Sequence, residues 1–247
     1  ILMEQCSGTV KRLSLELGGN APFIIFSDAD MDLAVKAAMA SKFRNAGQTC
    51  VSADRFLVHS SVEEEFLSKF SAAIQEELTV GRGLVDGVTM GPLINAQAVS
   101  SLESKLKESL SDVNTDCIVG GAALSSLGPN FFQPTVVRNV QTSSRLWATE
   151  TFGPIAAVRT FESDEEALEI ANNSKSGLAS YFCTRDAGRL FRVLDRLENG
   201  LVGINEGIFS TAVAPFGGIK ESGIGREGSS IGIEEYLETK YAFLNHD

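Results

Sequence analysis

One cysteine, Cys50, stands just beyond a segment whose apolar pattern predicts the end of a helix. It closes the stretch FRNAGQTC, in which Gly47 and its neighbours let backbone N–H groups approach a thiol closely. A thiolate is the reactive form of cysteine, and nearby N–H dipoles or cations lower its pKa. Arg44, one short loop upstream, is such a cation or a site for an anionic substrate. Cys50 is therefore a candidate nucleophile, although a free cysteine is also commonly a small buried apolar residue.

The second candidate is Glu16 in LELGG, which stands at the expected end of a strand beside two glycines. Such a carboxylate is either solvated or half-buried. If it is half-buried, desolvation raises its pKa toward neutrality, which suits a general base. Together, Cys50 and Glu16 indicate covalent catalysis at a carbonyl carbon, in which the thiolate attacks and the carboxylate later activates water to release an acyl group.

The composition of the 247-residue chain argues against several other functions. A net charge of −11 with no run of Lys or Arg disfavours nucleic acid and anionic membranes as partners. No apolar run approaches the roughly 20 residues that span a bilayer. The cysteines have no CxxC spacing and the two histidines have no third ligand, which argues against a metal site and a disulfide framework. The chain is expected to be intracellular, in a reducing compartment.

The elements that must position Cys50 and Glu16 alternate between strands and helices. Ser61 and Ser163 each open a capping box that predicts a helix start. Strands are predicted at 12–19, 21–26, 55–59, 117–121, 131–137, 152–161, 179–184 and 201–205, and helices at 31–46, 61–78, 96–110, 163–172 and 187–199. This alternation predicts an α/β fold with a mainly parallel sheet and flanking helices. A GxGxxG match at 223–228 has no strand before it and is interpreted as a loop.

Three motifs in this order, LELGG, FRNAGQTC and ETFGP, resemble the aldehyde dehydrogenase superfamily, and the resemblance runs across the whole chain. The stretches MEQCSGTVKRLSLELGGNAPFI and NEGIFSTAVAPFGGIKESGIGREGS are most similar to its succinate-semialdehyde dehydrogenases. The resemblance implies the aldehyde dehydrogenase catalytic-domain fold, NAD or NADP as cofactor, a small-molecule aldehyde as substrate and a homo-oligomer, dimer or tetramer. It also implies a soluble enzyme of the mitochondrion or the cytoplasm.

The resemblance also assigns catalytic and cofactor roles. Cys50 matches the nucleophile, which forms a thiohemiacetal and then a thioester, and Glu16 matches the base that activates the hydrolytic water. Glu150 matches the residue that holds the nicotinamide ribose. Phe152 lies against the nicotinamide side of the cofactor in that family, and Leu17 matches a backbone contact to it.

The substrate roles follow in the same way. Arg44 and Ser210 match residues that bind the far carboxylate of succinate semialdehyde, and a guanidinium fork suits a carboxylate bidentately. The alternative for Arg44 is a structural ion pair. Phe43 and Phe216 match residues that line the aldehyde tunnel.

Some relatives carry a second cysteine at the position of Ser52. The other cysteines are predicted to be packing residues: Cys6, Cys117 and Cys183.

The resemblance divides the chain into three parts: 1–18 as the end of a cofactor domain with a linker strand, 19–220 as the catalytic domain, and 221–247 as an oligomerisation segment. The family's N-terminal cofactor domain is absent from these residues, so the chain is expected to be a catalytic half that is inactive alone. The expected reaction is oxidation of succinate semialdehyde to succinate. The alternatives are another short acidic aldehyde such as glutarate semialdehyde, a fragment that only folds or oligomerises, and a cofactor-free thioesterase-like hydrolase.

Overall fold

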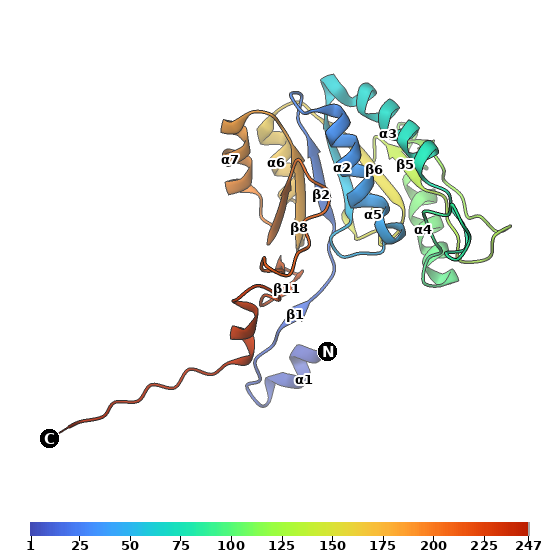
Figure 1. Ribbon diagram of the computed structural model, residues 1–247. Coiled ribbons are helices and arrows are strands. Elements are labelled where there is room, and N and C mark those ends of the chain that lie inside the picture. The colour runs from blue at the N-terminus through green and yellow to red at the C-terminus, as the bar shows by residue number, and fades with distance from the viewer. Residues whose placement is uncertain (247) are drawn as a thin grey trace.

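The computed structural model describes residues 1–246 and is built on a seven-stranded sheet (Figure 1). Its strands are β2 (Ala21–Ile25), β3 (Ala53–His59), β4 (Asp116–Val119), β5 (Thr135–Arg138), β6 (Ile155–Phe161), β8 (Ala179–Cys183) and β9 (Leu201–Ile204). They lie in the order β4-β5-β6-β3-β2-β8-β9. Neighbouring strands are parallel except β4, which runs antiparallel to β5. The predicted α/β fold with a mainly parallel sheet is confirmed.

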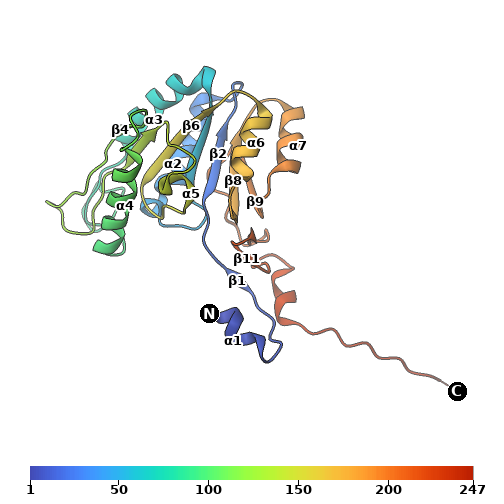
Figure 2. The ribbon, with the colours of Figure 1, turned by 180° about the vertical axis from the view of Figure 1, so that it is seen from behind.

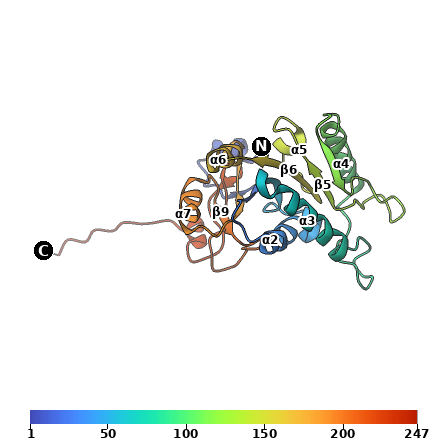
Figure 3. The same ribbon diagram turned by 90° about the horizontal axis from the view of Figure 1, so that it is seen from above.

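Helices cover both faces of this sheet. They are α2 (Met31–Phe43), α3 (Glu63–Glu77), α4 (Ala96–Ser109), α5 (Arg145–Ala148), α6 (Asp164–Asn172) and α7 (Ala187–Arg196). Figure 1 shows α2 and α3 in front of the sheet, and Figure 2 shows α4, α5 and α6 in front when the molecule is seen from behind. The view from above separates the same two layers (Figure 3). The crossovers β2–α2–β3 and β6–α6–β8 move in opposite directions along the sheet, so right-handed connections place α2 and α6 on opposite faces.

The core runs through the middle of the sheet. All five residues of β2 are buried, and the ring of Phe23 stacks between those of Phe56 on β3 and Tyr181 on β8, at 5.3 and 5.6 Å between centroids. A parallel sheet covered on both faces needs apolar residues on both sides of each strand. This requirement explains why APFII has no polar alternation.

Several short elements lie outside the main sheet. They are α1 (Leu2–Ser7), β1 (Leu15–Glu16), β7 (Ser176–Gly177), β10 (Ile219–Lys220), β11 (Gly223–Ile224) and the 3-10 turns η1 (Arg44–Gly47), η2 (Ser60–Val62) and η3 (Gly232–Tyr236). β1 pairs with β11 and β10 pairs with β7, both antiparallel. Figure 1 shows α1 and the C-terminal tail projecting away from the sheet. The division into 1–18, 19–220 and 221–247 remains a prediction.

Some local predictions were wrong. The strand expected at 12–19 is reduced to β1, because this segment pairs with β11 rather than with the main sheet. Ser61 does not cap α3, since the turn η2 intervenes and Ser61 bonds to His59 instead. Ser163 does cap α6 by accepting the N–H of Glu166. The segment 223–228 begins in β11 and bonds back to Phe216, so it has no strand–turn–helix arrangement.

The cysteines outside the candidate site differ in burial. Cys183 on β8 is 1% exposed, which confirms its packing role. Cys117 is exposed, so the packing prediction for it was wrong. It lies on β4, the edge strand of the sheet, which has a neighbouring strand on one side only. Cys6 is half-buried on α1, a helix with no fully buried residue.

Candidate active site

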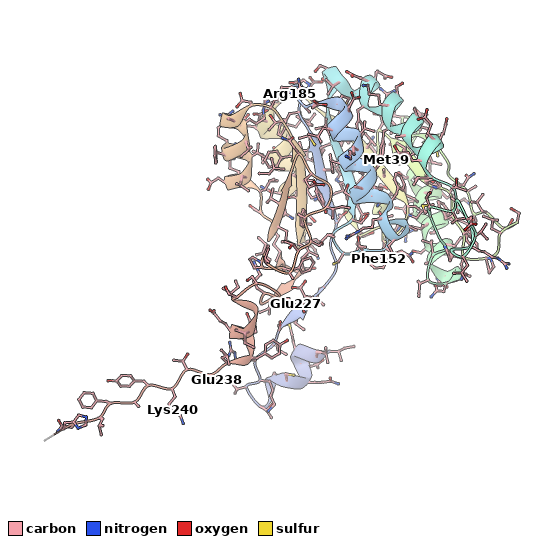
Figure 4. All side chains as sticks on the ribbon, in the orientation of Figure 1. Met39, Phe152, Arg185, Glu227, Glu238 and Lys240 are labelled. Atoms are coloured by element: carbon pink, nitrogen blue, oxygen red, sulfur yellow. The ribbon has the colours of Figure 1, made fainter. Side chains whose placement is uncertain are left out.

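The predicted catalytic residues gather at the amino-terminal edge of three neighbouring strands. The glycine pair 18–19 precedes β2, Cys50 precedes β3 and Glu150 precedes β6. These strands are adjacent in the order β6-β3-β2. Because parallel strands begin at the same edge of a sheet, residues far apart in the sequence converge there. Figure 4 shows Phe152 at this edge and Arg185 at the opposite end of the domain.

The loop that carries Cys50, residues 44–52, is called the thiol loop below. Within it, Asn45 and Ala46 have φ of 53° and 55°, and Gly47 follows with 72°. A Cβ at position 47 would lie 2.3 Å from the carbonyl oxygen of Gly153. Left-handed backbone at a non-glycine residue costs about 1–2 kcal/mol and concentrates at functional sites. Packing against the 149–154 loop, rather than local preference, therefore holds the thiol loop in shape.

The second glycine of LELGG lies directly against the thiol loop. A Cβ on Gly19 would stand 2.0 Å from the carbonyl oxygen of Cys50, far inside contact distance. The segment that carries Glu16 approaches Cys50 only because position 19 has no side chain. Oε2 of Glu16 is buried and has no hydrogen-bond partner among residues 1–246, so it can accept a proton from water.

The environment of Glu16 suits a general base. Burial raises the pKa of its carboxyl, the carboxylate of Glu227 raises it further, and the charge of Arg226 opposes both. Figure 4 shows Glu227 below the sheet, on the side of the candidate site. A carboxylate with a raised pKa accepts protons more readily at neutral pH. The half-buried alternative from the sequence is therefore the one that the structure supports.

The environment of the thiol differs from what the sequence predicted. Burial raises the pKa of the Cys50 thiol, and the charges of Glu150 and Glu16 raise it further. The backbone N–H groups of Cys50 and Val51 lower it, as expected, but they do not prevail. Burial is the main reason why the pKa of this half-buried thiol is raised rather than lowered, and the carboxylates of Glu150 and Glu16 add to its effect.

Glu150 is held by glycines on one side and by a lysine on the other. Its Oε1 accepts the N–H of Gly19 at 2.8 Å, and a Cβ on Gly18 would lie 2.7 Å from its Oε2. Nζ of Lys105 on α4 donates to the main-chain oxygen of Glu150 at 2.5 Å. Burial raises the pKa of the Glu150 carboxyl, and the N–H of Gly19 opposes this. The carboxylate is thus fixed in a glycine-lined cradle where a hydroxyl group could donate to it.

The other two predicted cofactor residues border this cradle. Phe152 has φ of 48° and is 44% exposed, so its ring is available at the surface. Leu17 is also exposed, and its N–H donates to the carbonyl oxygen of Ser222 at 3.0 Å. Its amide is therefore already used within the chain, and only its carbonyl is left for a backbone contact.

The two predicted carboxylate-binding residues, Arg44 and Ser210, are both exposed. The ion pairs formed by residues 1–246 leave Arg44 without a carboxylate partner, which argues against the structural alternative. Burial raises the pKa of the Tyr181 phenol, and the charge of Arg44 opposes this, which places Arg44 near that ring. Tyr181 stacks at 5.0 Å on Phe209, the neighbour of Ser210. Arg44 and Ser210 are therefore both associated with this aromatic pair, Arg44 through its charge near Tyr181 and Ser210 as the chain neighbour of Phe209.

The two predicted tunnel residues lie in different surroundings. Phe43 is 4% exposed and its ring centroid lies 5.9 Å from that of Phe70, so it packs in the core, and its place in an aldehyde tunnel stays a prediction. The reason is its place at the end of α2, where the helix packs on α3. Phe216 is half-buried and exchanges two backbone hydrogen bonds with Glu227, at 2.8 and 2.7 Å. Phe216 is therefore close to the surroundings of Glu16.

Comparison with known proteins bears on the origin of this arrangement. The profile of the aldehyde dehydrogenase family matches residues 1–242. The chain belongs to the aldehyde dehydrogenase family.

Similar proteins include enzymes for acidic aldehydes. The succinate semialdehyde dehydrogenase of Acinetobacter baylyi is 52% identical over 244 residues, which are 99% of this chain and 50% of the relative. The glutarate-semialdehyde dehydrogenase of Pseudomonas aeruginosa is 49% identical over 98% of this chain and 50% of its own length. A crystal structure of an Escherichia coli NADP dependent enzyme superposes with a TM-score of 0.93 at 51% identity, covering 96% of this chain and 49% of the other. The chain thus spans about half the length of these relatives and has their fold.

Some residues of this aldehyde dehydrogenase chain reach the site without any local sequence signal. They are Lys105 and Tyr181, whereas Phe209, Arg226 and Glu227 lie in the stretch NEGIFSTAVAPFGGIKESGIGREGS on which the resemblance already rests. Each comes from an element far along the chain, so only the topology of the sheet brings it near Cys50. The glycine pair of LELGG was the one available signal for close approach, because such a pair permits backbone contact.

Three further observations concern residues 1–246. A cavity of about 710 Å³ opens between α5 and α6, lined by Trp147, Arg159 and Lys175 among others, and Cys50 does not line it. Within the described chain, no helix is long and apolar enough to cross a membrane. The same residues contain no group of three or more His, Cys, Asp or Glu side chains that could hold a metal ion.

Proposed function

We propose that this chain supplies the catalytic machinery of an NAD(P)-dependent aldehyde dehydrogenase that oxidises a short acidic aldehyde, with succinate semialdehyde preferred to glutarate semialdehyde. The observation that carries the proposal is the convergence of Cys50, Glu16 and Glu150 at one sheet edge, with Gly19 touching both the thiol loop and Glu150. The names of the relatives support the choice of substrate class.

In the proposed reaction, the Cys50 thiol first loses its proton to water, and the thiolate Sγ then attacks the aldehyde carbon to form a thiohemiacetal, whose oxyanion accepts the N–H of Cys50. When bound, the nicotinamide cofactor supplies the acceptor for the hydride of this carbon. Cys50 then carries a thioester. Glu16 takes a proton from water as the water oxygen attacks the thioester carbon. The carbon–sulfur bond then breaks, the acid is released, and the sulfur of Cys50 takes up a proton to become a free thiol again.

The residues around Glu150 fit the nicotinamide half of such a cofactor. The Glu150 carboxylate is fixed by the N–H of Gly19 and lies over the bare Cα of Gly18, so it can accept hydrogen bonds from ribose hydroxyls. The partly exposed ring of Phe152 borders the same place. These residues would hold the ring end of NAD or NADP beside Cys50.

Arg44 is the proposed selector of acidic aldehydes. Its guanidinium has no protein carboxylate to neutralise it among residues 1–246 and stands one short loop from Cys50. A charged, forked donor in the same loop as Cys50 suits the far carboxylate of a short semialdehyde. Ser210, the chain neighbour of Phe209 in the Tyr181–Phe209 pair, would add a hydroxyl donor.

The test uses the full-length natural protein that contains these residues, assayed with succinate semialdehyde, glutarate semialdehyde and butanal in the presence of NAD or NADP. Cys50→Ser should abolish turnover of all three. Arg44→Gln should lower kcat/KM for succinate semialdehyde by about 10- to 100-fold, because it removes hydrogen bonds to a charged group, and should spare butanal. Arg192→Gln, an exposed arginine on α7, is the control.

Other outcomes would redirect the proposal. An equal loss for butanal and succinate semialdehyde in Arg44→Gln would refute the selector role and leave the dehydrogenase intact. Hydrolysis of an activated ester without NAD, with no oxidation of any aldehyde, would favour the thioesterase-like alternative.

The natural protein is also proposed to be a homo-oligomer. The elements that project from the sheet carry large exposed apolar side chains, namely Ile1, Leu2, Tyr241, Phe243 and Leu244. Exposed apolar patches of this kind mark interaction surfaces. Light scattering on the full-length protein should therefore give a mass of two or four protomers.

A further inference from the structure

Beneath the candidate site lies an ion pair that the proposed mechanism does not use. Nζ of Lys42, in the last turn of α2, donates to Oδ1 of Asp54, near the start of β3, at 2.7 Å. The two side chains are 0% and 2% exposed. Withdrawing two charges from water costs several kcal/mol per ion, so apolar residues of similar volume often stabilise a fold as well as a buried pair does. Stability alone therefore gives no reason for this pair.

The pair joins the two loops that form the site. Oδ2 of Asp54 accepts the N–H of Thr151 at 2.9 Å, one residue from Glu150. The main-chain oxygen of Lys42 accepts the hydroxyl of Ser52 at 3.4 Å, at the end of the thiol loop. Both oxygens of the Asp54 carboxylate are thus engaged, one by α2 and one by the loop that carries Glu150.

A second buried cation lies beside the pair but does not replace it. Arg55 is 1% exposed, and its three donor nitrogens bond to the carbonyl oxygens of Asn20, Ile170 and Ala171. Its guanidinium is therefore committed to main-chain acceptors on the other side of β3. Lys42 is the ion-pair partner of Asp54 among residues 1–246.

We propose that the Lys42–Asp54 pair positions Glu150 relative to Cys50 by fixing the 149–154 loop against the thiol loop. The inference rests on the proposed function and deepens it, since it names two positioning residues for the same site. The electrostatics agree with this proximity. After burial and the N–H of Gly19, the charges of Asp54 and Lys42 are among the influences on the pKa of the Glu150 carboxyl, and they act in opposite directions.

Three variants of the full-length protein separate positioning from stability. Lys42→Met leaves the Asp54 carboxylate buried without a cation, and Asp54→Asn leaves the ammonium group without an anion, so both should lower Tm. The double variant Lys42→Met/Asp54→Asn has no buried charge and retains an amide oxygen for the N–H of Thr151. It should recover most of the lost Tm but not the tether from α2 to the 149–154 loop.

Two readouts report on the site itself. The first is the rate constant for alkylation of Cys50 by iodoacetamide at pH 8, followed by mass spectrometry, with the exposed Cys117 as internal reference. Release of the Glu150 loop should relieve the charge repulsion on the thiolate and raise this rate by about threefold or more in the double variant. The second is kcat/KM for the cofactor, which should fall on the order of 10- to 100-fold.

Asp28→Asn is the matched control, since Asp28 forms its ion pair with Arg189 at the carboxyl ends of the strands, away from Cys50. It should lower Tm and leave both site readouts unchanged.

The proposal is overturned if the double variant recovers Tm, the Cys50 rate and kcat/KM together, because the pair is then only structural. It is also overturned if the Cys50 rate does not respond in any variant. Should the double variant not fold, Asp54→Asn alone, which keeps an acceptor for Thr151, is judged by the same readouts.

The failure of the proposed function would look different. If the unmodified protein oxidises no aldehyde, the dehydrogenase proposal fails, while the Tm and alkylation measurements still decide whether the pair positions Glu150 against Cys50.

Discussion

At the scale of single residues, the candidate site combines the proposed nucleophile Cys50 with two carboxylates that oppose its ionisation. Burial raises the pKa of the Cys50 thiol first, and Glu150 and Glu16 add to the effect. A resting thiol protected in this way is less exposed to oxidation, because the thiolate is the form that oxidises. Its reactivity then depends on what happens to the neighbouring carboxylates, and a bound cofactor that engages Glu150 would change that balance.

This dependence is testable with Glu150→Gln. The variant removes the negative charge that opposes thiolate formation, so the pKa of Cys50 should fall and alkylation at pH 8 should become about threefold faster or more. Alkylation rates are measured from pH 6 to pH 10 by mass spectrometry. Glu169→Gln, an exposed carboxylate on α6, is the control and should leave the profile unchanged. An identical profile for Glu150→Gln would show that the charge of Glu150 does not contribute to this pKa.

At the scale of elements, glycines decide how closely the loops of the site approach one another. Gly47 combines a φ of 72° with a virtual Cβ only 2.3 Å from the carbonyl oxygen of Gly153. Gly47→Ala should therefore lower the free energy of unfolding by about 2 kcal/mol or more, because strain and a backbone clash add. Urea unfolding measures this loss. Gly83→Ala, where the virtual Cβ has no neighbour within 4 Å, should change stability little. Equal effects of the two substitutions would contradict the close approach.

The elements themselves could largely be predicted from the sequence. Alternating apolar runs and helix signals predicted every strand of the main sheet. The signal is clearest for β2, β3 and β8, whose residues are almost all buried, and it persists in the edge strand β4, although most residues of β4 are exposed. The short elements could not be predicted in this way. β1, for example, is two residues long and exists only because β11, more than two hundred residues away in the sequence, pairs with it.

The site was predictable only in part, for the same physical reason. Cys50 and Glu16 stand in motifs whose glycines point to close backbone contact. The rise in the pKa of the thiol was not predictable, because it results first from burial in the folded chain and then from Glu150, which acts on Cys50 through space from a loop a hundred residues later. Lys105 and Asp54 reach the 149–154 loop in the same way. Neither lies in a motif that would have drawn attention to it.

At the scale of the whole molecule, the two ends of the sheet have different tasks. In open α/β sheets, ligands usually bind at the carboxyl ends of the strands where the strand order reverses. Here the chain passes from β2 to β3 in one direction along the sheet and from β8 to β9 in the other, so such a point exists between β2 and β8. It is filled by Asp28, which accepts the hydroxyl of Thr184, the N–H groups of Arg185 and Asp186, and the guanidinium of Arg189. The candidate site lies at the opposite, amino-terminal edge.

This division predicts a pH-dependent stability that is separate from activity. Burial would raise the pKa of the Asp28 carboxyl, but the hydrogen bonds to it and the charge of Arg189 bring the pKa below its ordinary value. A lowered folded-state pKa gives stability that is present above the unfolded-state pKa and is lost as the pH falls through the folded-state value. Asp28→Asn should therefore lower the free energy of unfolding at pH 7 by about 1–3 kcal/mol, and the difference from the unmodified protein should shrink at pH values below about 4.

Urea unfolding at a series of pH values measures this difference, with the exposed Asp195→Asn on α7 as control. Alkylation of Cys50 should be the same in both variants, because Asp28 and Cys50 lie at opposite ends of the parallel strands. A difference in stability that does not change with pH would mean that Asp28 acts through shape rather than charge. A change in the Cys50 rate would mean that the two ends of the sheet are coupled, and stability could then not be altered at one end without disturbing the chemistry at the other.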